Sequence, residues 1–219
     1  FMHARTLLAD GRAGRLLAVS FRDDQFIPIQ SHYGSTWRID PTRCGRGTLL
    51  EHSIHDIDIM RFLLGDEIDR VFAESRSHIA TGNEDIFAGL VRFHRGAMGT
   101  LDINWLTPTK ERTLTVLCEK GMFVVDYAAQ SLAFYENFDA AAREGRYASV
   151  TEGPMTRYPI PNREPLRVEL EAFRDAVLAG GPPPVSALDG MAALAIAEAL
   201  VRSGETGMPV QVEAVAAST

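Results

Sequence analysis

The stretch IFAGLVRFHRGAMGTLDINW, residues 86–105, decides the fold class of this chain. Apolar residues recur at every second position over residues 87–93 and again over residues 101–105. Strict alternation is typical of β-strands with one buried face, and Arg95-Gly96 between the two runs is typical of a turn. We therefore expect an antiparallel hairpin here.

The same period of two extends over residues 70–135, with a second hairpin at Glu119-Lys120-Gly121. Further strands are expected at 16–21, 131–136 and 210–212, and helices at 1–10, 49–65, 165–179 and 187–203. The sequence thus predicts an α+β fold with an open, mainly antiparallel β-sheet and helices on one face. Several strands are apolar in both phases, so we expect a homodimer or homotetramer through the other sheet face.

Composition excludes several classes of function. With 46% hydrophobic and 23% charged residues, the 219-residue chain is ordinary for a soluble globular protein. The net charge of −7 and the lack of a basic stripe argue against a nucleic-acid partner. No apolar run approaches the roughly 20 residues that cross a bilayer, and no signal-peptide pattern occurs. We read Cys44 and Cys118 as reduced thiols and expect a cytoplasmic protein without a membrane partner.

The run LLEHSIHDIDIMRFLLG, residues 49–65, gathers polar groups on a predicted helix. Glu51, His55 and Asp58 stand at i, i+4 and i+7 and share one helix face. The run fits a solvated helix flank, a metal site through His52 and His55, or an acid–base pair in which a carboxylate orients a histidine. Spacing alone leaves these readings open, and no cysteine pair or distant histidine cluster completes a metal site.

The surrounding sequence resembles a known family. GRGTLLEHSIHDIDIMRFLLG (residues 45–65) is similar to a signature of the glucose–fructose oxidoreductase/inositol dehydrogenase (Gfo/Idh/MocA) family. Residues 11–23 resemble that family's first sheet strand, and residues 164–212 resemble its last helix pair and final strand. Residues 103–137 are most similar to members that act on nucleotide-linked sugars, such as UDP-N-acetylhexosamine dehydrogenases.

The resemblance implies an N-terminal Rossmann domain followed by a C-terminal domain with an open antiparallel sheet, and this chain matches only the second. It contains no strand followed by GxGxxG and no Glu-Lys-Pro segment, which supplies the family's catalytic lysine. We expect residues 1–14 to be the tail of a linking helix, 15–213 the substrate-binding and oligomerisation domain, and 214–219 a C-terminal tail. NAD or NADP would be bound mainly by the missing domain, which is either truncated or present elsewhere.

By this resemblance His55 matches the family's catalytic histidine and Glu51 its partner carboxylate, which is more often aspartate. Asp58 matches a further aspartate. Trp37 and Arg38 match a Trp-Arg pair that precedes the glycine turn, and an indole and a guanidinium suit a sugar.

The stretch similar to nucleotide-sugar enzymes adds Trp105, Lys110 and Arg112 to the expected substrate contacts. The two basic side chains fit either a substrate phosphate or the charge pattern of an edge strand. Arg46 replaces the middle glycine of the family's three-glycine turn, and its effect on the substrate pocket is open.

The function expected from the sequence is that of a substrate domain in an NAD(P)-dependent oxidoreductase. Hydride would pass between nicotinamide and a hydroxyl carbon of a sugar, cyclitol or nucleotide sugar, and the fragment alone would be inactive. Two alternatives remain: a non-catalytic dimerisation or binding module, and a metal-dependent hydrolase built around His52 and His55.

Overall fold

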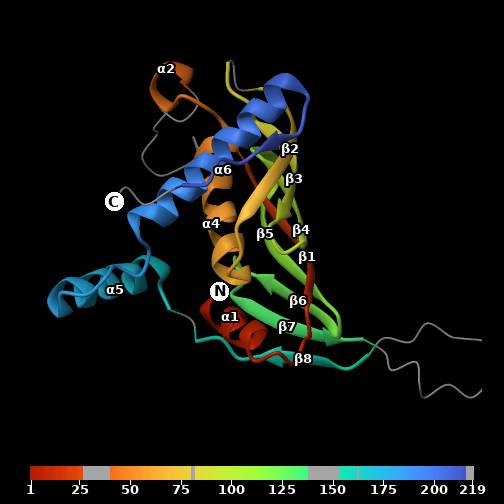
Figure 1. Cartoon of the computed structure of the whole chain (residues 1–219), viewed down its shortest axis with the longest axis vertical. Coiled ribbons are helices and arrows are strands. Elements are labelled where there is room, and N and C mark those ends of the chain that lie inside the picture. Colours follow the sequence, from red (N-terminus) through yellow and green to blue (C-terminus); the bar gives the residue numbers. More distant parts are fainter. Residues whose placement is uncertain (27–39, 80–81, 138–152, 162, 216–219) are drawn as a thin grey trace, which may run out of the picture.

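The computed structural model describes residues 1–26, 40–79, 82–137, 153–161 and 163–215. In these residues one open sheet forms the centre of the molecule and helices cover one of its faces (Figure 1). The α+β class predicted from the alternating pattern is therefore confirmed. None of the described helices is long and apolar enough to span a bilayer.

The sheet runs in the spatial order β8-β7-β6-β5-β1-β4-β3-β2-β9. The strands are β1 (Leu16–Phe26), β2 (Ile68–Arg76), β3 (Ile86–Phe93), β4 (Met98–Asn104), β5 (Leu106–Cys118), β6 (Gly121–Asp126), β7 (Ser131–Glu136), β8 (Met155–Tyr158) and β9 (Val210–Gln211). β1 pairs in parallel with β4 and antiparallel with β5, and the other neighbours are antiparallel.

Both hairpins form where the sequence predicts them. β3 returns into β4 through Gly96, whose φ of 93° lies in the left-handed region that glycine adopts without strain. β5 returns into β6 with Cys118 opposite Gly121, which leaves a two-residue turn. β1 extends to Phe26, beyond the strand expected at 16–21, and Pro41–Cys44 forms a short helix.

The helices are α1 (Met2–Ala9), α2 (Pro41–Cys44), α3 (Thr48–Glu51), α4 (Ser53–Leu64), α5 (Pro165–Ala179) and α6 (Ala187–Thr206). α4 and α6 lie against the sheet and against each other (Figure 1), and they bury Ile57, Met60, Ile196 and Leu200 in the common core. Both helices have capping residues. Ser186 and Asp189 form a reciprocal capping box on α6, and Gly65 ends α4 in the left-handed conformation.

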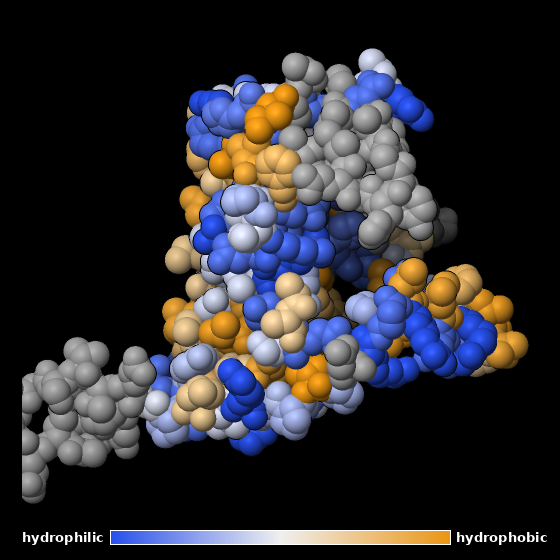
Figure 2. All heavy atoms as spheres, turned by 180° about the vertical axis from the view of Figure 1, so that it is seen from behind, coloured by the Kyte–Doolittle hydropathy of each residue, from blue (hydrophilic) through white to orange (hydrophobic). Residues whose placement is uncertain are grey.

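Two apolar surfaces stay exposed. α5 buries none of its residues, and Leu166, Leu170, Phe173 and Val177 along it are exposed. Figure 2 shows these apolar side chains on the helix that stands out from the rest. On the uncovered sheet face Leu90, Met98 and Leu117 are also exposed, so the oligomer expected there stays a prediction.

Candidate active site

The polar run 49–65 forms two helices, whereas the sequence suggested one. α3 ends at Glu51, His52 has φ −107° and ψ −53°, and α4 begins at Ser53. The physical reason is the side chain of His52, which turns into the interior instead of lying along the helix surface. Glu51 and His55 consequently lie on either side of a helix junction.

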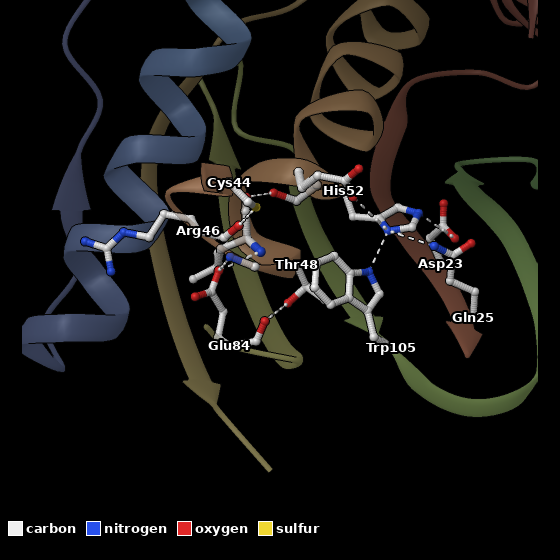
Figure 3. A network of polar contacts seen from close by, with 12 residues as sticks. Asp23, Gln25, Cys44, Arg46, Thr48, His52, Glu84 and Trp105 are labelled. Atoms are coloured by element: carbon white, nitrogen blue, oxygen red, sulfur yellow. Dashed lines mark hydrogen bonds and ion pairs between the residues drawn. The ribbon is translucent and has the colours of Figure 1, made fainter. Parts of the chain in front are cut away.

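A loop after β2 holds the start of α3. The Glu84 carboxylate accepts hydrogen bonds from Gly47 N (2.9 Å) and Leu49 N (3.1 Å), and the Glu84 carbonyl accepts one from Thr48 N (3.0 Å). Glu84 thus serves as an N-cap supplied from a distant part of the chain (Figure 3). A Cβ at Gly47 would lie 1.8 Å from the Glu84 carbonyl oxygen, so only glycine fits this position.

Arg46, the departure from the family's glycine turn, leans toward α6. Its Nη2 lies 2.5 Å from Oε1 of Glu205, and Figure 3 shows the guanidinium directed away from His52. The side chain therefore does not enter the buried cluster beside α4.

His52 is the centre of that buried cluster, which also includes Asp23, Trp105, Arg112 and Tyr127. The imidazole is 6% exposed, and its Nδ1 accepts the indole N–H of Trp105 at 2.9 Å. Its Nε2 lies 3.5 Å from Oδ1 of Asp23 and 3.0 Å from Nη2 of Arg112. Asp23 in turn accepts hydrogen bonds from Tyr127 (2.5 Å) and from Nε of Arg112 (2.9 Å).

Asp56 lies next to this cluster on the buried face of α4. It is 1% exposed, and its Oδ2 has no hydrogen-bond partner among the described residues. Burial raises the pKa of Asp56 well above its ordinary value, and the negative charge of Asp23 raises it further. Burial also lowers the pKa of His52 and, with Asp56 and Asp23, raises that of Tyr127. These pKa shifts favour the neutral forms of Asp56, His52 and Tyr127 around the Asp23–Arg112 ion pair.

Of the residues predicted on the helix, His55 is exposed on α4 and Glu51 is half-buried at the end of α3. Glu51 Oε2 lies 3.9 Å from Nδ1 of His52. Asp58 forms an ion pair with Arg61 at 3.7 Å, and partial burial raises its pKa. These three therefore line one stretch of the α3–α4 surface, with His52 beneath it.

The predicted substrate contacts outside the helix differ in how exposed they are. Trp105 is fully buried, so its assignment as a substrate contact is wrong; the indole is needed in the core, where it donates to His52. Arg112 is mostly engaged with Asp23, whereas Lys110 is exposed and borders a pocket of about 690 Å³ that Tyr127 also lines. Trp37 and Arg38 lie outside the described residues.

Asp23 and Tyr127 are functional candidates that the sequence did not reveal. The available signal was Arg22-Asp23-Asp24, an unusual run of charges inside a strand that occupies the middle of a sheet. No group of three histidine, cysteine, aspartate or glutamate side chains suited to a metal ion occurs within the described residues.

Comparison with known proteins gives the family context. The family model described as GFO/IDH/MocA C-terminal domain matches residues 1–124. The 1,5-anhydro-D-fructose reductase of Ensifer adhaerens is 26% identical over 213 residues, covering 95% of this chain and 60% of the relative. The myo-inositol 2-dehydrogenase of Thermotoga maritima is 28% identical over 183 residues, covering 81% of this chain and 52% of the relative.

Solved structures show the same fold. Levoglucosan dehydrogenase in complex with NADH and levoglucosan superposes with a TM-score of 0.81 at 22% identity, over 97% of this chain and 62% of that one. The chain thus spans about half to three-fifths of the length of the proteins that it matches.

Proposed function

Because the chain belongs to the GFO/IDH/MocA family, we propose that it is the substrate domain of an NAD(P)-dependent oxidoreductase that acts on a CH–OH group of a sugar or cyclitol. The observation that carries this proposal is the arrangement at the α3–α4 junction. There an exposed histidine, His55, follows a half-buried carboxylate, Glu51, on the helix pair whose sequence resembles the family signature. Oxidation of an alcohol requires a group that takes the hydroxyl proton as hydride leaves the carbon, and histidine suits this role near neutral pH.

The surroundings of the two histidines support a choice of His55 over His52. The Nδ1 lone pair of His52 is occupied by the indole N–H of Trp105, and the ring is buried. It therefore has no basic nitrogen to offer a substrate. We assign the role of general base to His55 and the role of orienting carboxylate to Glu51, with Asp58 as a further polar contact.

The pyrophosphate of a dinucleotide does not fit the described part of this chain. In the described residues no strand leads into a glycine-rich loop and a helix, and Gly11 and Gly14 with φ of 76° and 75° lie between α1 and β1. We propose that NAD or NADP is held by a separate dinucleotide-binding domain, with residues 1–14 as the connecting helix, 15–213 as the substrate domain and 214–219 as a tail. The nicotinamide would supply the hydride acceptor.

The substrate class is proposed in two steps. The printed names of the relatives are those of sugar and inositol enzymes, which favours a free sugar or cyclitol. The resemblance of residues 103–137 to nucleotide-sugar enzymes adds a finer alternative, in which exposed Lys110 contacts a phosphate at the pocket. Trp37 and Arg38 remain predicted substrate contacts.

We also propose a homodimer or homotetramer in the cytoplasm, formed through the uncovered sheet face. Exposed Leu90, Met98 and Leu117 support it, because a sheet with both faces apolar needs a partner on each. Light scattering of wild type and of Leu90→Lys tests this: the variant should dissociate, and an unchanged mass would remove this face from consideration.

The experiment that tests the activity is mutation of His55 in the complete enzyme, with a substrate panel of sugars, cyclitols and nucleotide sugars. His55→Ala should lower kcat by about a hundredfold or more, the usual contribution of a general base, with little change in cofactor affinity. The matched control is His94→Ala, an exposed histidine next to the β3–β4 turn. Full turnover by His55→Ala would refute the assignment.

The same panel separates the alternatives. A wild-type protein that turns over no member of the panel would favour the non-catalytic binding module. A stoichiometric metal found by elemental analysis, together with hydrolytic activity that a chelator abolishes, would favour the metal-dependent hydrolase.

A further inference from the structure

His52 lies at the junction of α3 and α4, between the two residues assigned to the chemistry. Its backbone N–H donates to Thr48 O at 3.3 Å, and its carbonyl accepts from His55 N at 3.2 Å. Glu51 is its immediate neighbour. Any shift of His52 therefore moves Glu51 and His55 together.

The contacts of the His52 ring fix its tautomer. The indole nitrogen of Trp105 can only donate, so Nδ1 of His52 must be the acceptor at 2.9 Å. A neutral imidazole has one lone pair on its ring nitrogens, so the proton is on Nε2, which faces Asp23 Oδ1 at 3.5 Å. Arg112 Nη2 lies 3.0 Å from the same nitrogen, and its Nε donates to Asp23 at 2.9 Å, so the ring lies against the Asp23–Arg112 pair.

Asp23 is itself fixed to the middle of the sheet. It lies on β1, is 3% exposed, and accepts hydrogen bonds from Tyr127 after β6 and from Arg112 on β5. Hydrogen bonds to an ionised group are shorter and stronger than those between neutral groups. The carboxylate therefore cannot follow a movement of the helix junction without losing these partners.

We propose that Asp23 and His52 are positioning residues: the contacts of the His52 ring with Trp105 and with the Asp23–Arg112 pair fix the α3–α4 junction on the sheet and so set the relative placement of Glu51 and His55. The catalytic part of this inference rests on the proposed function. His52 itself exchanges no proton with the substrate. A misplacement of reacting groups by about 1 Å is enough to cost about a hundredfold in rate, so the junction needs such an anchor.

Substitutions of His52 can remove its hydrogen-bond acceptor and its donor separately. His52→Asn keeps an acceptor near Nδ1 for Trp105 but loses the donor to Asp23. His52→Gln keeps a donor near Nε2 but loses the acceptor. His52→Phe keeps the ring and loses both, and His94→Phe is the matched control at an exposed histidine.

The first measurement is ¹⁵N NMR of the histidines in this chain, and it needs no enzymatic activity. Wild-type His52 should carry its proton on Nε2 and titrate at a lower pH than an ordinary histidine, because burial lowers its pKa. In His52→Gln and His52→Phe the backbone amide signals of Glu51 and His55 should shift, whereas His94→Phe should leave them unchanged. A proton on Nδ1, or unshifted amide signals of Glu51 and His55 in folded variants, would overturn the proposal.

The second measurement is steady-state kinetics in the complete enzyme. We expect His52→Phe to lower kcat by about tenfold or more with KM within about threefold, and His52→Asn and His52→Gln to fall between it and the wild type. A kcat for folded His52→Phe equal to that of wild type would overturn the positioning role. If the wild type shows no turnover, the proposed function fails, while the tautomer of His52 and the amide signals of Glu51 and His55 still decide the positioning role. Should His52→Phe not fold, His52→Asn and the wild-type spectrum decide it.

Discussion

Asp56→Asn tests the protonation state of the buried cluster through stability. The wild-type carboxyl is 1% exposed, and its pKa is raised above the ordinary value first by burial and then by Asp23, with Arg112 opposing. The folded chain therefore holds a proton that the unfolded chain releases as the pH rises above about 4. Stability contributed by this group is fully present below the unfolded pKa and is lost as the pH rises toward the folded pKa.

The size of the effect follows from linkage. For each pH unit in which the folded chain keeps one proton that the unfolded chain has lost, the free energy of unfolding falls by up to about 1.4 kcal/mol. Asparagine does not titrate. The free energy of unfolding of Asp56→Asn, relative to that of the wild type, should therefore rise by up to this amount for each pH unit above about pH 4 and then level off.

Urea unfolding, followed by circular dichroism at a series of pH values from about 4 to 8, measures the difference in free energy of unfolding between variant and wild type. The control Glu169→Gln removes an exposed carboxylate on α5, and its difference from the wild type should not change with pH over the same range. A flat difference for Asp56→Asn, or one that falls with pH, would refute the assignment of a buried neutral acid.

Three further outcomes are expected. Gly47→Ala should destabilise the fold by about 1–3 kcal/mol, since the new Cβ meets the Glu84 carbonyl; Gly181→Ala, with open space around its Cβ, should be near neutral in the same urea titration. Trp105→Phe should lower the free energy of unfolding by about 1–3 kcal/mol through the lost indole donor, and an unchanged melting curve would contradict this. Cys118, buried and with a thiol pKa raised to about 11, should resist alkylation at about pH 8 until the protein unfolds, as mass spectrometry would detect.

The local sequence pattern was enough to predict most of the helices and strands. β7 matches its predicted limits, Ser131–Glu136, and the capping box at Ser186 and the glycine end of α4 occur where the sequence indicates. These features depend on neighbours within a few residues. The insertion of β1 between β4 and β5 could not be predicted, because strand order depends on pairings far apart along the chain.

The site was harder to predict for the same reason. Helical spacing could not tell His52 from His55, since both lie among carboxylates along the same run. The difference comes from Trp105 and Asp23, which reach His52 from 53 and 29 residues away, respectively. Trp105 was misassigned because an indole that binds a sugar and an indole that completes a core have the same local sequence.

The central position of β1 also constrains how the protein folds. Asp24 pairs with Asn104, 80 residues later, and Tyr127 reaches Asp23 across 104 residues. The hairpins β3–β4 and β5–β6 close through short turns. In contrast, β1 is synthesised before β4 and β5, and it can pair only after both of these strands are available. Closing such large loops is entropically costly and slow, so β1 should gain amide protection late in pulsed hydrogen exchange. The carboxylate of Asp23 would then reach its partners only in the last step of folding, so the proposed site at the α3–α4 junction would form only when the whole sheet is assembled.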